Sequence, residues 1–479
     1  MNYVFYDLET TGVNPNFDQP IQIAAILVNE NLDIIDEPIN EICRINEGVI
    51  ANPGALMVNK VDIDVLNSAQ SFYDFMDCIQ QKFSSWSPAV FVGYNSISFD
   101  EEFMRNHLFQ SLHEPYLTNT NNNSRADIYK MVLGLEPLGV DAIKFPKNKE
   151  NRKISFKLVD IARENNVTQE KAHDALSDVY ATIGVAKLIK ENAPDYWDEC
   201  MKTINPMSMH NYLESDSLFF AAPMGTTQNE YTPISYLINN PEYLKELAFF
   251  DLRYDPLKYC DKKSQIISSM IGKIGQKNKP IRILKTNNSP IILSSSYIKQ
   301  KNIYTKEEIS EYNKKSEYVT GDEFEGFRGR LEFQLKEKLQ AYHGKDRPHE
   351  LEKQLYGGPF FSDSDKAKMK IFKNIHEPHE RYKLSKEFED KRLREISYRI
   401  IFSECPDILP DEKQKERKQF IHAKVFSTTG KEDWCTIDKA KDELAKIKDS
   451  NKYVNHKDYI DEIEKYIHSE EEKYKSYSS

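Results

Sequence analysis

Two acidic residues stand two positions apart in the first apolar stretch of the chain. Asp7 and Glu9 follow the apolar residues 3–6 and precede Thr10-Thr11-Gly12, a pattern typical of a buried strand that runs into a turn. Side chains two apart on a strand share a face of the sheet, so these carboxylates repel each other. A divalent cation between them would remove that cost. Taken alone, such a pair more often belongs to the solvated face of an edge strand.

Two further acids and a histidine make the metal site the better interpretation. Asp100 follows a second apolar strand at 89–93 and is expected in the first turn of a helix, with Ser98 as its N-cap. Asp178 falls in a helix predicted over 175–189 from apolar residues at helical spacing. His173 stands just before that helix, and its ordinary pKa of ~6.5 lets it accept a proton near neutral pH. Carboxylate oxygens suit Mg²⁺ or Mn²⁺.

The ordered motifs Asp-x-Glu-Thr-Thr-Gly, Asn-x-x-x-Phe-Asp and His-x-x-x-x-Asp resemble those of the DEDDh family of 3′ to 5′ exonucleases. The resemblance implies that Asp7, Glu9, Asp100 and Asp178 hold two Mg²⁺ ions, with Mn²⁺ as the alternative. It implies that His173 is the general base and that Glu9 also serves catalysis and contacts the substrate. In such a site, two ions ~3.5–4 Å apart clamp the attacking and leaving oxygens of an in-line displacement.

The order of the predicted elements defines a fold class and three domains. Strands at 3–9, 21–28 and 34–43, a helix at 71–83 and the strand at 89–93 give an α/β order, which matches the ribonuclease-H-like fold of DEDDh proteins. At ~150 residues per domain, the chain divides into 1–198, 199–345 and 346–479. The second part has short β-like segments between Asn, Pro and Gly turns, and the third has helical runs at 364–374, 386–402 and 433–447.

Four residues between the motifs are candidates for substrate contacts. Arginine suits bidentate phosphate binding and tyrosine suits base stacking, so Arg105, Arg125 and Tyr116 are candidates. Each is equally compatible with an ion pair or a core aromatic. Lys157 occupies the place where exonuclease I proteins carry a basic residue near the terminal phosphate, and arginine is expected there.

The composition indicates where a basic surface can lie and in which compartment the protein works. The net charge is −11, so any basic surface for nucleic acid must be local. Residues 258–285 contain seven lysines and Arg282 against the single acid Asp261, which indicates either such a surface or a solvated loop. The six cysteines include no close pair, which favours reduced thiols in the cytoplasm. No apolar run reaches the ~18 residues of a membrane span, and no secretory signal is recognisable.

Further segments resemble bacterial exonuclease I over most of the chain. They are the run from Gln354 to Asp363, which contains an additional Pro359, Asp390-Lys391-Arg392-Leu393 and Tyr398-Arg399. The resemblance implies an SH3-like second domain and a helical third domain that close over the nuclease domain to form a channel. It implies a monomer that degrades single-stranded DNA from the 3′ end to 5′-mononucleotides in repair and recombination. It also implies binding to the acidic, apolar C-terminal tail of the single-stranded-DNA-binding protein.

Two other functions remain open at this point. A DEDDh nuclease that trims RNA or proofreads would share the motifs, although the long extension beyond the first domain argues against it. A nucleic-acid-binding scaffold with a silent nuclease domain is the alternative outside the enzymes, although all five motif residues are present.

Overall fold

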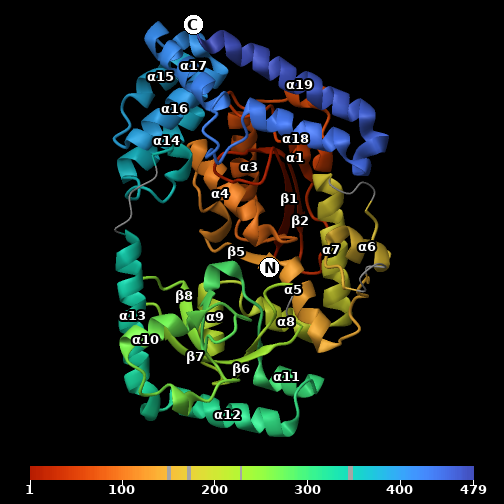
Figure 1. Cartoon of the computed structure of the whole chain (residues 1–479), viewed down its shortest axis with the longest axis vertical. Coiled ribbons are helices and arrows are strands. Elements are labelled where there is room, and N and C mark those ends of the chain that lie inside the picture. Colours follow the sequence, from red (N-terminus) through yellow and green to blue (C-terminus); the bar gives the residue numbers. More distant parts are fainter. Residues whose placement is uncertain (148–152, 170–173, 227–228, 344–348, 479) are drawn as a thin grey trace.

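The computed structural model describes residues 1–147, 153–169, 174–226, 229–343 and 349–478. The first domain is built on a five-stranded sheet of order β3-β2-β1-β4-β5. Central β1 pairs antiparallel with β2 and parallel with β4. Figure 1 shows β1 and β2 near the middle of the molecule. The strands are β1 (Tyr3–Thr10), β2 (Pro20–Val28), β3 (Ile39–Ile42), β4 (Val90–Gly93) and β5 (Ser124–Asp127).

Alternate side chains of β1 enter two different cores, which makes the domain three-layered. Tyr3 and Phe5 pack with α5 (Ile128–Leu135) and α7 (Ala175–Asn192) on one face. Val4, Tyr6 and Leu8 pack with α3 (Phe72–Trp86) and α4 (Asp100–Gln110) on the other. Because the side-chain period of a strand is two, Asp7 and Glu9 continue the face that α7 covers.

The remaining elements of this domain connect the layers. They are α1 (Pro53–Asn59), α2 (Ile63–Ser68), α6 (Leu158–Glu164) and α8 (Pro194–Met201). The predicted strands and helices of this domain are present, with β3 shorter than expected. The N-cap prediction was wrong: residues 96–98 form a short 3₁₀ turn, Phe99 is the N-cap of α4, and Ser98 makes no capping hydrogen bond.

A second sheet forms the central part of the chain, with the order β11-β6-β7-β8-β10-β9. Its strands are β6 (Phe219–Ala221), β7 (Thr232–Asn239), β8 (Glu246–Asp251), β9 (Ile271–Gly272), β10 (Ile281–Lys285) and β11 (Ile292–Ser294). The helices α9 (Pro206–Leu213), α10 (Ser264–Met270) and α11 (Ser295–Lys301) flank it. Two longer helices, α12 (Lys306–Thr320) and α13 (Glu325–His343), were not predicted; a capping box between Thr305 and Glu308 begins α12.

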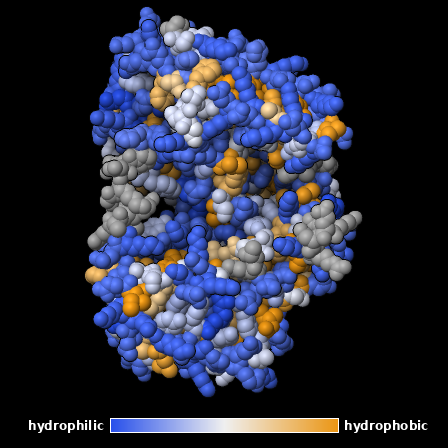
Figure 2. Space-filling view, in the orientation of Figure 1, coloured by the Kyte–Doolittle hydropathy of each residue, from blue (hydrophilic) through white to orange (hydrophobic). Residues whose placement is uncertain are grey.

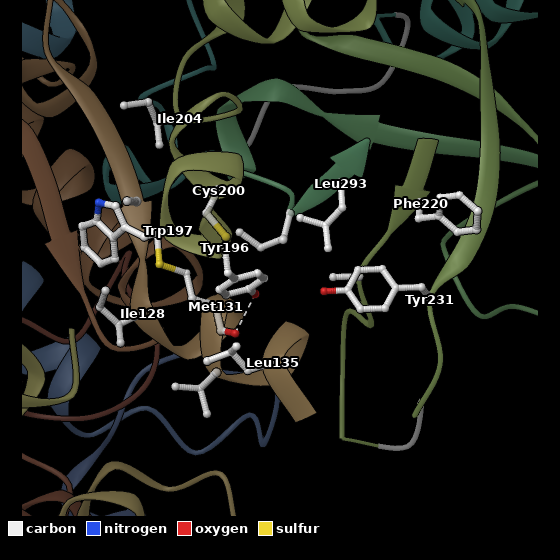
Figure 3. Packing of buried hydrophobic residues seen from close by; sticks show 14 of the residues in the cluster. Ile128, Met131, Leu135, Tyr196, Trp197, Cys200, Ile204, Phe220, Tyr231 and Leu293 are labelled. Atoms are coloured by element: carbon white, nitrogen blue, oxygen red, sulfur yellow. Dashed lines mark hydrogen bonds between the residues drawn. The ribbon is translucent and has the colours of Figure 1, made fainter. Parts of the chain in front are cut away.

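The first domain and the central sheet share one hydrophobic core (Figure 3). Figure 3 shows Met131 and Leu135 of α5 and Tyr196 of α8 facing Leu293 of β11 and Tyr231. The hydroxyl of Tyr196 donates to the carbonyl of Met131 at 2.8 Å, and that of Tyr231 donates to the carbonyl of Gly134 at 2.8 Å. The expected boundary between residues 198 and 199 falls inside α8. The expected boundary between residues 345 and 346 lies outside the described residues.

The C-terminal part is helical and packs on the first domain. It comprises α14 (Asp363–Asn374), α15 (Pro378–Ser385), α16 (Lys391–Glu404), α17 (Asp411–Val425), α18 (Ile437–Asp449) and α19 (Lys457–Lys475). Its core includes Leu56 and Met57 of α1, and the hydroxyl of Tyr466 accepts a hydrogen bond from the amide of Ala51 at 3.1 Å. Figure 2 shows the face of the molecule hollowed between these helices and the central domain.

No helix in the described part of the chain has both the length and the apolar composition that a membrane span requires.

Candidate active site

Three carboxylates of the predicted set converge beside the central strand. Ligand oxygens of Asp7 and Glu9 on β1 and of Asp178 on α7 all lie within 4.8 Å of one another. Each of the three residues is partly buried. Since α7 packs over the β1 face on which Asp7 and Glu9 lie, the alternation of β1 and the position of Asp178 in the first turn of α7 produce this cluster.

Asp100 is fixed against the same strand by a hydrogen bond to the backbone. One of its oxygens accepts from the amide of Leu8 at 3.0 Å, and Leu8 lies between the two acids of β1. Asp100 is only 4% exposed and occupies the first position of α4, as predicted. The backbone bond therefore orients this carboxylate beside the cluster.

The electrostatics of the cluster demand a positive charge. Burial raises the pKa of Asp7 well above its usual value, and the charges of Asp100 and Glu9 raise it further. Burial, followed by the charge of Asp178, raises the pKa of Glu9 to about 9. Burial also raises the pKa of Asp100 to about 8. Converging oxygen donors of this kind fit divalent ions such as Mg²⁺ or Mn²⁺.

Two neighbours of the cluster escaped the sequence analysis. Asp174 is the N-cap of α7, where it accepts from the amide of Ser177 at 3.2 Å, and its charge further raises the pKa values of Asp7 and Glu9. The position of Asp174 directly before a helical pattern could have identified it as an N-cap from the sequence. The side chain of Gln169 donates to Asp178 at 2.7 Å, and no sequence pattern indicates that contact.

The turn after β1 requires its glycine. A Cβ at Gly12 would lie 2.4 Å from a carboxylate oxygen of Asp18, too close for any other residue without displacing that side chain. The hydroxyl of Thr10 donates to the carbonyl of Gly12 at 2.6 Å, and the hydroxyl of Thr11 accepts from the amide of Gln19 at 2.9 Å. The Thr-Thr-Gly part of the motif thus shapes the loop that follows the acids.

His173, the expected general base, lies outside the described residues. Lys157 is exposed and forms the N-cap position of α6. The preceding residue is tied to the end of β4, because the hydroxyl of Tyr94 donates to the carbonyl of Phe156 at 2.6 Å. The exposed Lys157 therefore lies near the end of β4, the strand that neighbours β1.

The two candidate arginines, Arg105 and Arg125, are buried and bind other groups of the protein. Arg125 is 4% exposed, pairs with Glu101 at 2.8 Å and donates to the carbonyl of Asn287 in the central domain at 2.8 Å. This burial argues against a phosphate contact and assigns Arg125 a structural role between the two domains. Arg105 is also buried, donating to Glu102 at 2.8 Å and to the hydroxyl of Tyr356 at 3.0 Å.

Tyr116 lies next to the Arg105 cluster. Its ring centroid is 5.9 Å from the Arg105 guanidinium, and burial raises its pKa to about 12. Tyr356 from the C-terminal part is 63% exposed at the same place, so an aromatic side chain reaches the surface where the first and third parts of the chain meet. Tyr116 stays a candidate for a base contact.

The lysine-rich segment 258–285 is mostly exposed, with one correction. Arg282 is buried and pairs with Asp251 at 2.7 Å, and it also donates to the carbonyls of Lys273 and Gln276. Arg282 therefore holds the segment to β8 rather than adding to a basic surface. Six of the seven lysines, among them Lys262, Lys263 and Lys277, are exposed, and Lys279 is partly buried.

Comparisons with known proteins were made for both the sequence and the fold. The family model described as Exonuclease matches residues 4–186, and the model described as Exonuclease I C-terminal domain matches residues 349–470. Exodeoxyribonuclease I of Escherichia coli (strain K12) is 26% identical over 440 residues, which cover 89% of this chain and 90% of that protein. Exodeoxyribonuclease I of Buchnera aphidicola subsp. Acyrthosiphon pisum (strain APS) is 27% identical over 419 residues, covering 83% and 96%.

Solved structures share the whole fold. E. coli exonuclease I in complex with a dA16 oligonucleotide superposes with a TM-score of 0.83 at 22% identity and covers 99% of both chains. A moderately thermophilic exonuclease I from Methylocaldum szegediense gives 0.80 at 22% identity and covers 100% of both. The predicted class, an α/β exonuclease domain followed by a β-rich domain and a C-terminal helical domain, is confirmed.

The three-layered fold, the acidic cluster on β1 and α7 and the matching family model define the first domain as an exonuclease domain. The C-terminal match and the similarity along most of the chain narrow this class further. Along most of its length the chain is similar to the exonuclease I proteins, and the curated relatives that it matches over this length are exodeoxyribonucleases I.

Proposed function

We propose that this chain is a single-strand-specific exodeoxyribonuclease that degrades DNA from the 3′ end to 5′-mononucleotides. The observation that carries the proposal is the convergence of Asp7, Glu9 and Asp178 within 4.8 Å, with Asp100 hydrogen bonded to the amide of Leu8 between the two β1 acids. We further propose that it acts as a monomer in DNA repair and recombination.

The four carboxylates would hold two divalent ions, most simply Mg²⁺. Such ions supply a nucleophile at neutral pH and neutralise charge on the attacked phosphate. The protein contributes a rigid cage, because β1 fixes Asp7 and Glu9, the start of α7 fixes Asp178, and the Leu8 amide orients Asp100. The positions of these acids on regular elements keep the oxygens in place when ions and substrate leave.

His173 would accept the proton of the attacking water, a role that rests on its place in the His-x-x-x-x-Asp motif. Lys157 would contact the phosphate next to the 3′ end as a point charge. Tyr116, beside Arg105 and Tyr356, would stack against a base further along the strand.

Solved structures of similar proteins indicate which partners this chain binds. E. coli exonuclease I has been solved with dA16 and dT13 oligonucleotides, and a solved relative is an ExoI/SSB-Ct complex. We propose that this chain likewise binds single-stranded DNA and the C-terminal tail of the single-stranded-DNA-binding protein. A further relative is a zinc-bound form of the E. coli ExoI and single-stranded DNA complex, which supports a divalent-metal requirement.

The direct test is digestion of end-labelled DNA with Mg²⁺. The label should leave a 3′-labelled single strand first, as a mononucleotide, while a blunt duplex and a matched RNA strand are degraded far more slowly. Asp7→Asn and Asp178→Asn should stop turnover, and EDTA should do the same to the wild type. Equal rates on RNA would instead indicate a trimming nuclease, and DNA binding without any product would indicate a scaffold.

A further inference from the structure

A pocket of about 580 Å³ lies where the first domain meets the C-terminal helices. Phe17, from the turn after β1, forms one wall, and α16, α17 and Trp434 form the others. A smaller enclosed cavity of about 80 Å³ adjoins it and shares the lining residues Phe17, Leu351, Glu352, Arg399 and Lys424. The acids of the active site do not line either space.

Three cations lie around the buried acid Glu352: Arg399 and Lys424 line both the pocket and the smaller cavity, whereas Arg417 lines only the cavity. Arg399 pairs with Glu352 at 3.0 Å, and Lys424 lies 3.8 Å from the same carboxylate. Burial alone would raise the pKa of Glu352, but Arg399 and Lys424 outweigh it and hold the pKa at about 2. Arg399 also reaches Glu395 at 3.0 Å, so its charge is compensated. The third cation, Arg417, has no acid paired with it among the described residues.

Arg417 is the unsatisfied member of the group. Within the part of the chain that the structure describes, its side chain has no hydrogen bond or ion pair, and its buried Nε atom lacks an acceptor. Burial and the charge of Arg399 lower its pKa to about 10, although the more distant Glu395, Glu352 and Glu47 act in the opposite direction. Burial likewise lowers the pKa of Lys424 to about 8. Arg417 is partly buried, and leaving its buried Nε without an acceptor is costly, so an anion would remove that cost.

Aromatic rings line the pocket beside these cations. Phe420 is 48% exposed, and its ring lies 5.6 Å from the Arg399 guanidinium and 5.2 Å from that of Arg417. The rings of Phe17 and Trp434 pack with centroids 5.1 Å apart, with the ammonium of Lys424 near both. An exposed ring next to an unpaired guanidinium can stack a flat base while the cation binds its phosphate.

We propose that this pocket binds a nucleotide, with its phosphate at Arg417, Arg399 and Lys424 and its base against Phe420. Acids line both spaces: Glu350 and Glu395 in the pocket, and Glu47, Glu352 and Glu404 in the smaller cavity. A nucleotide fits better than an acidic peptide, because these acids repel a chain of carboxylates more strongly than a ligand that brings one phosphate to the three cations. The nucleotide is either a free mononucleotide or a unit of a DNA strand. Only the second source rests on the proposed function.

The test is calorimetric titration of the whole chain in EDTA, where phosphates have no ions to bridge them to the active-site acids. The probes are dAMP, inorganic phosphate, deoxyadenosine and oligothymidylates of increasing length. Arg417→Met should weaken nucleotide binding about ten- to hundredfold, the loss expected for hydrogen bonds to a charged group. Lys415→Met removes an equal charge from the exposed side of α17 and should leave binding unchanged.

Two further measurements locate the ligand. Phe420→Ala should weaken binding of dAMP but not of inorganic phosphate, and it avoids any folding defect from replacing the partly buried Arg417 because the ring is half exposed. Trp434 fluorescence should change on binding, since the other two tryptophans, Trp86 and Trp197, are buried elsewhere.

Each outcome has a fixed meaning. Arg417-dependent binding of dAMP identifies the free nucleotide, and Arg417-dependent binding of oligothymidylate alone identifies the strand. Three results would overturn the proposal. The first is binding of an acidic peptide in place of both nucleotide and strand, and the second is an equal effect of Arg417→Met and Lys415→Met. The third is no binding of dAMP at millimolar concentration together with no Arg417-dependent binding of oligothymidylate. Because no turnover is measured, these results are independent of whether the chain degrades DNA.

Discussion

Replacing Glu9 by glutamine should stabilise the metal-free protein while destroying its activity. The pKa of Glu9 is raised to about 9 from the 4.5 of an unconstrained glutamate, because of burial and the charge of Asp178. A carboxyl whose pKa is higher in the folded state stabilises that state below the unfolded pKa, and this contribution is lost as the pH rises toward the folded pKa. At pH 7 the folded protein must keep a proton that the unfolded chain has released. The penalty is about 3 kcal/mol at ~1.4 kcal/mol per pH unit above 4.5.

The assay is thermal unfolding at pH 7 in EDTA and again with Mg²⁺. Glu9→Gln should unfold at a higher temperature than the wild type in EDTA, because the amide has no charge to bury. The wild type should gain stability with Mg²⁺, by ~2.7 kcal/mol at one hundred times the dissociation constant, whereas Glu9→Gln should gain much less. Glu37→Gln, at an exposed position away from the cluster, is the matched control and should behave like the wild type. A lower unfolding temperature for Glu9→Gln in EDTA, or an undiminished response to Mg²⁺, would refute the reasoning.

Three other changes test the structure around the site. Arg125→Met leaves Glu101 buried without its 2.8 Å partner and should lower the free energy of unfolding in urea by ~3–5 kcal/mol. The double variant with Glu101→Gln should recover part of this stability. A loss below ~1 kcal/mol in Arg125→Met would contradict the buried pair. Ser98→Ala should change the free energy of unfolding by less than ~0.5 kcal/mol, because Ser98 caps no helix. A loss of ~1 kcal/mol, which is typical of removing an N-cap side chain, would instead support Ser98 as the N-cap. Burial lowers the pKa of His107 to about 4, so the folded state resists its protonation and stability should fall from pH 6.5 downward, by ~2 kcal/mol at pH 5. His107→Gln should flatten that part of the pH profile, and an unchanged profile would show that His107 does not cause it.

The acids could be predicted because their positions follow from short-range periodicity. The strand period places Asp7 and Glu9 on one face, and the helical pattern places Asp178 one turn into α7. What the sequence could not supply is the long-range partner of each side chain. Arg125 was a reasonable phosphate contact by type, yet Glu101 and the Asn287 carbonyl, 24 and 162 residues away, bury it.

The same limit explains the errors in the central region. Arg282 counted toward a basic surface because its neighbours in sequence are lysines, but its ion pair with Asp251 on β8 depends on strand pairing. The helices α12 and α13 were missed because their hydrophobic faces are narrow and their sequences are rich in charge. The unpartnered Arg417 could not be found either, since its neighbours come from the turn after β1 and from α16.

The core that α5 and α8 share with β6 and β11 limits how this protein can be divided. A fragment cut near residue 198 would end inside α8 and remove the neighbours that the ring of Tyr196 has in the central part, such as Tyr297 of α11. Such a fragment should aggregate or need a solubilising partner. The nuclease domain and the central sheet therefore share one core, and we expect a nuclease domain without the sheet to lose stability.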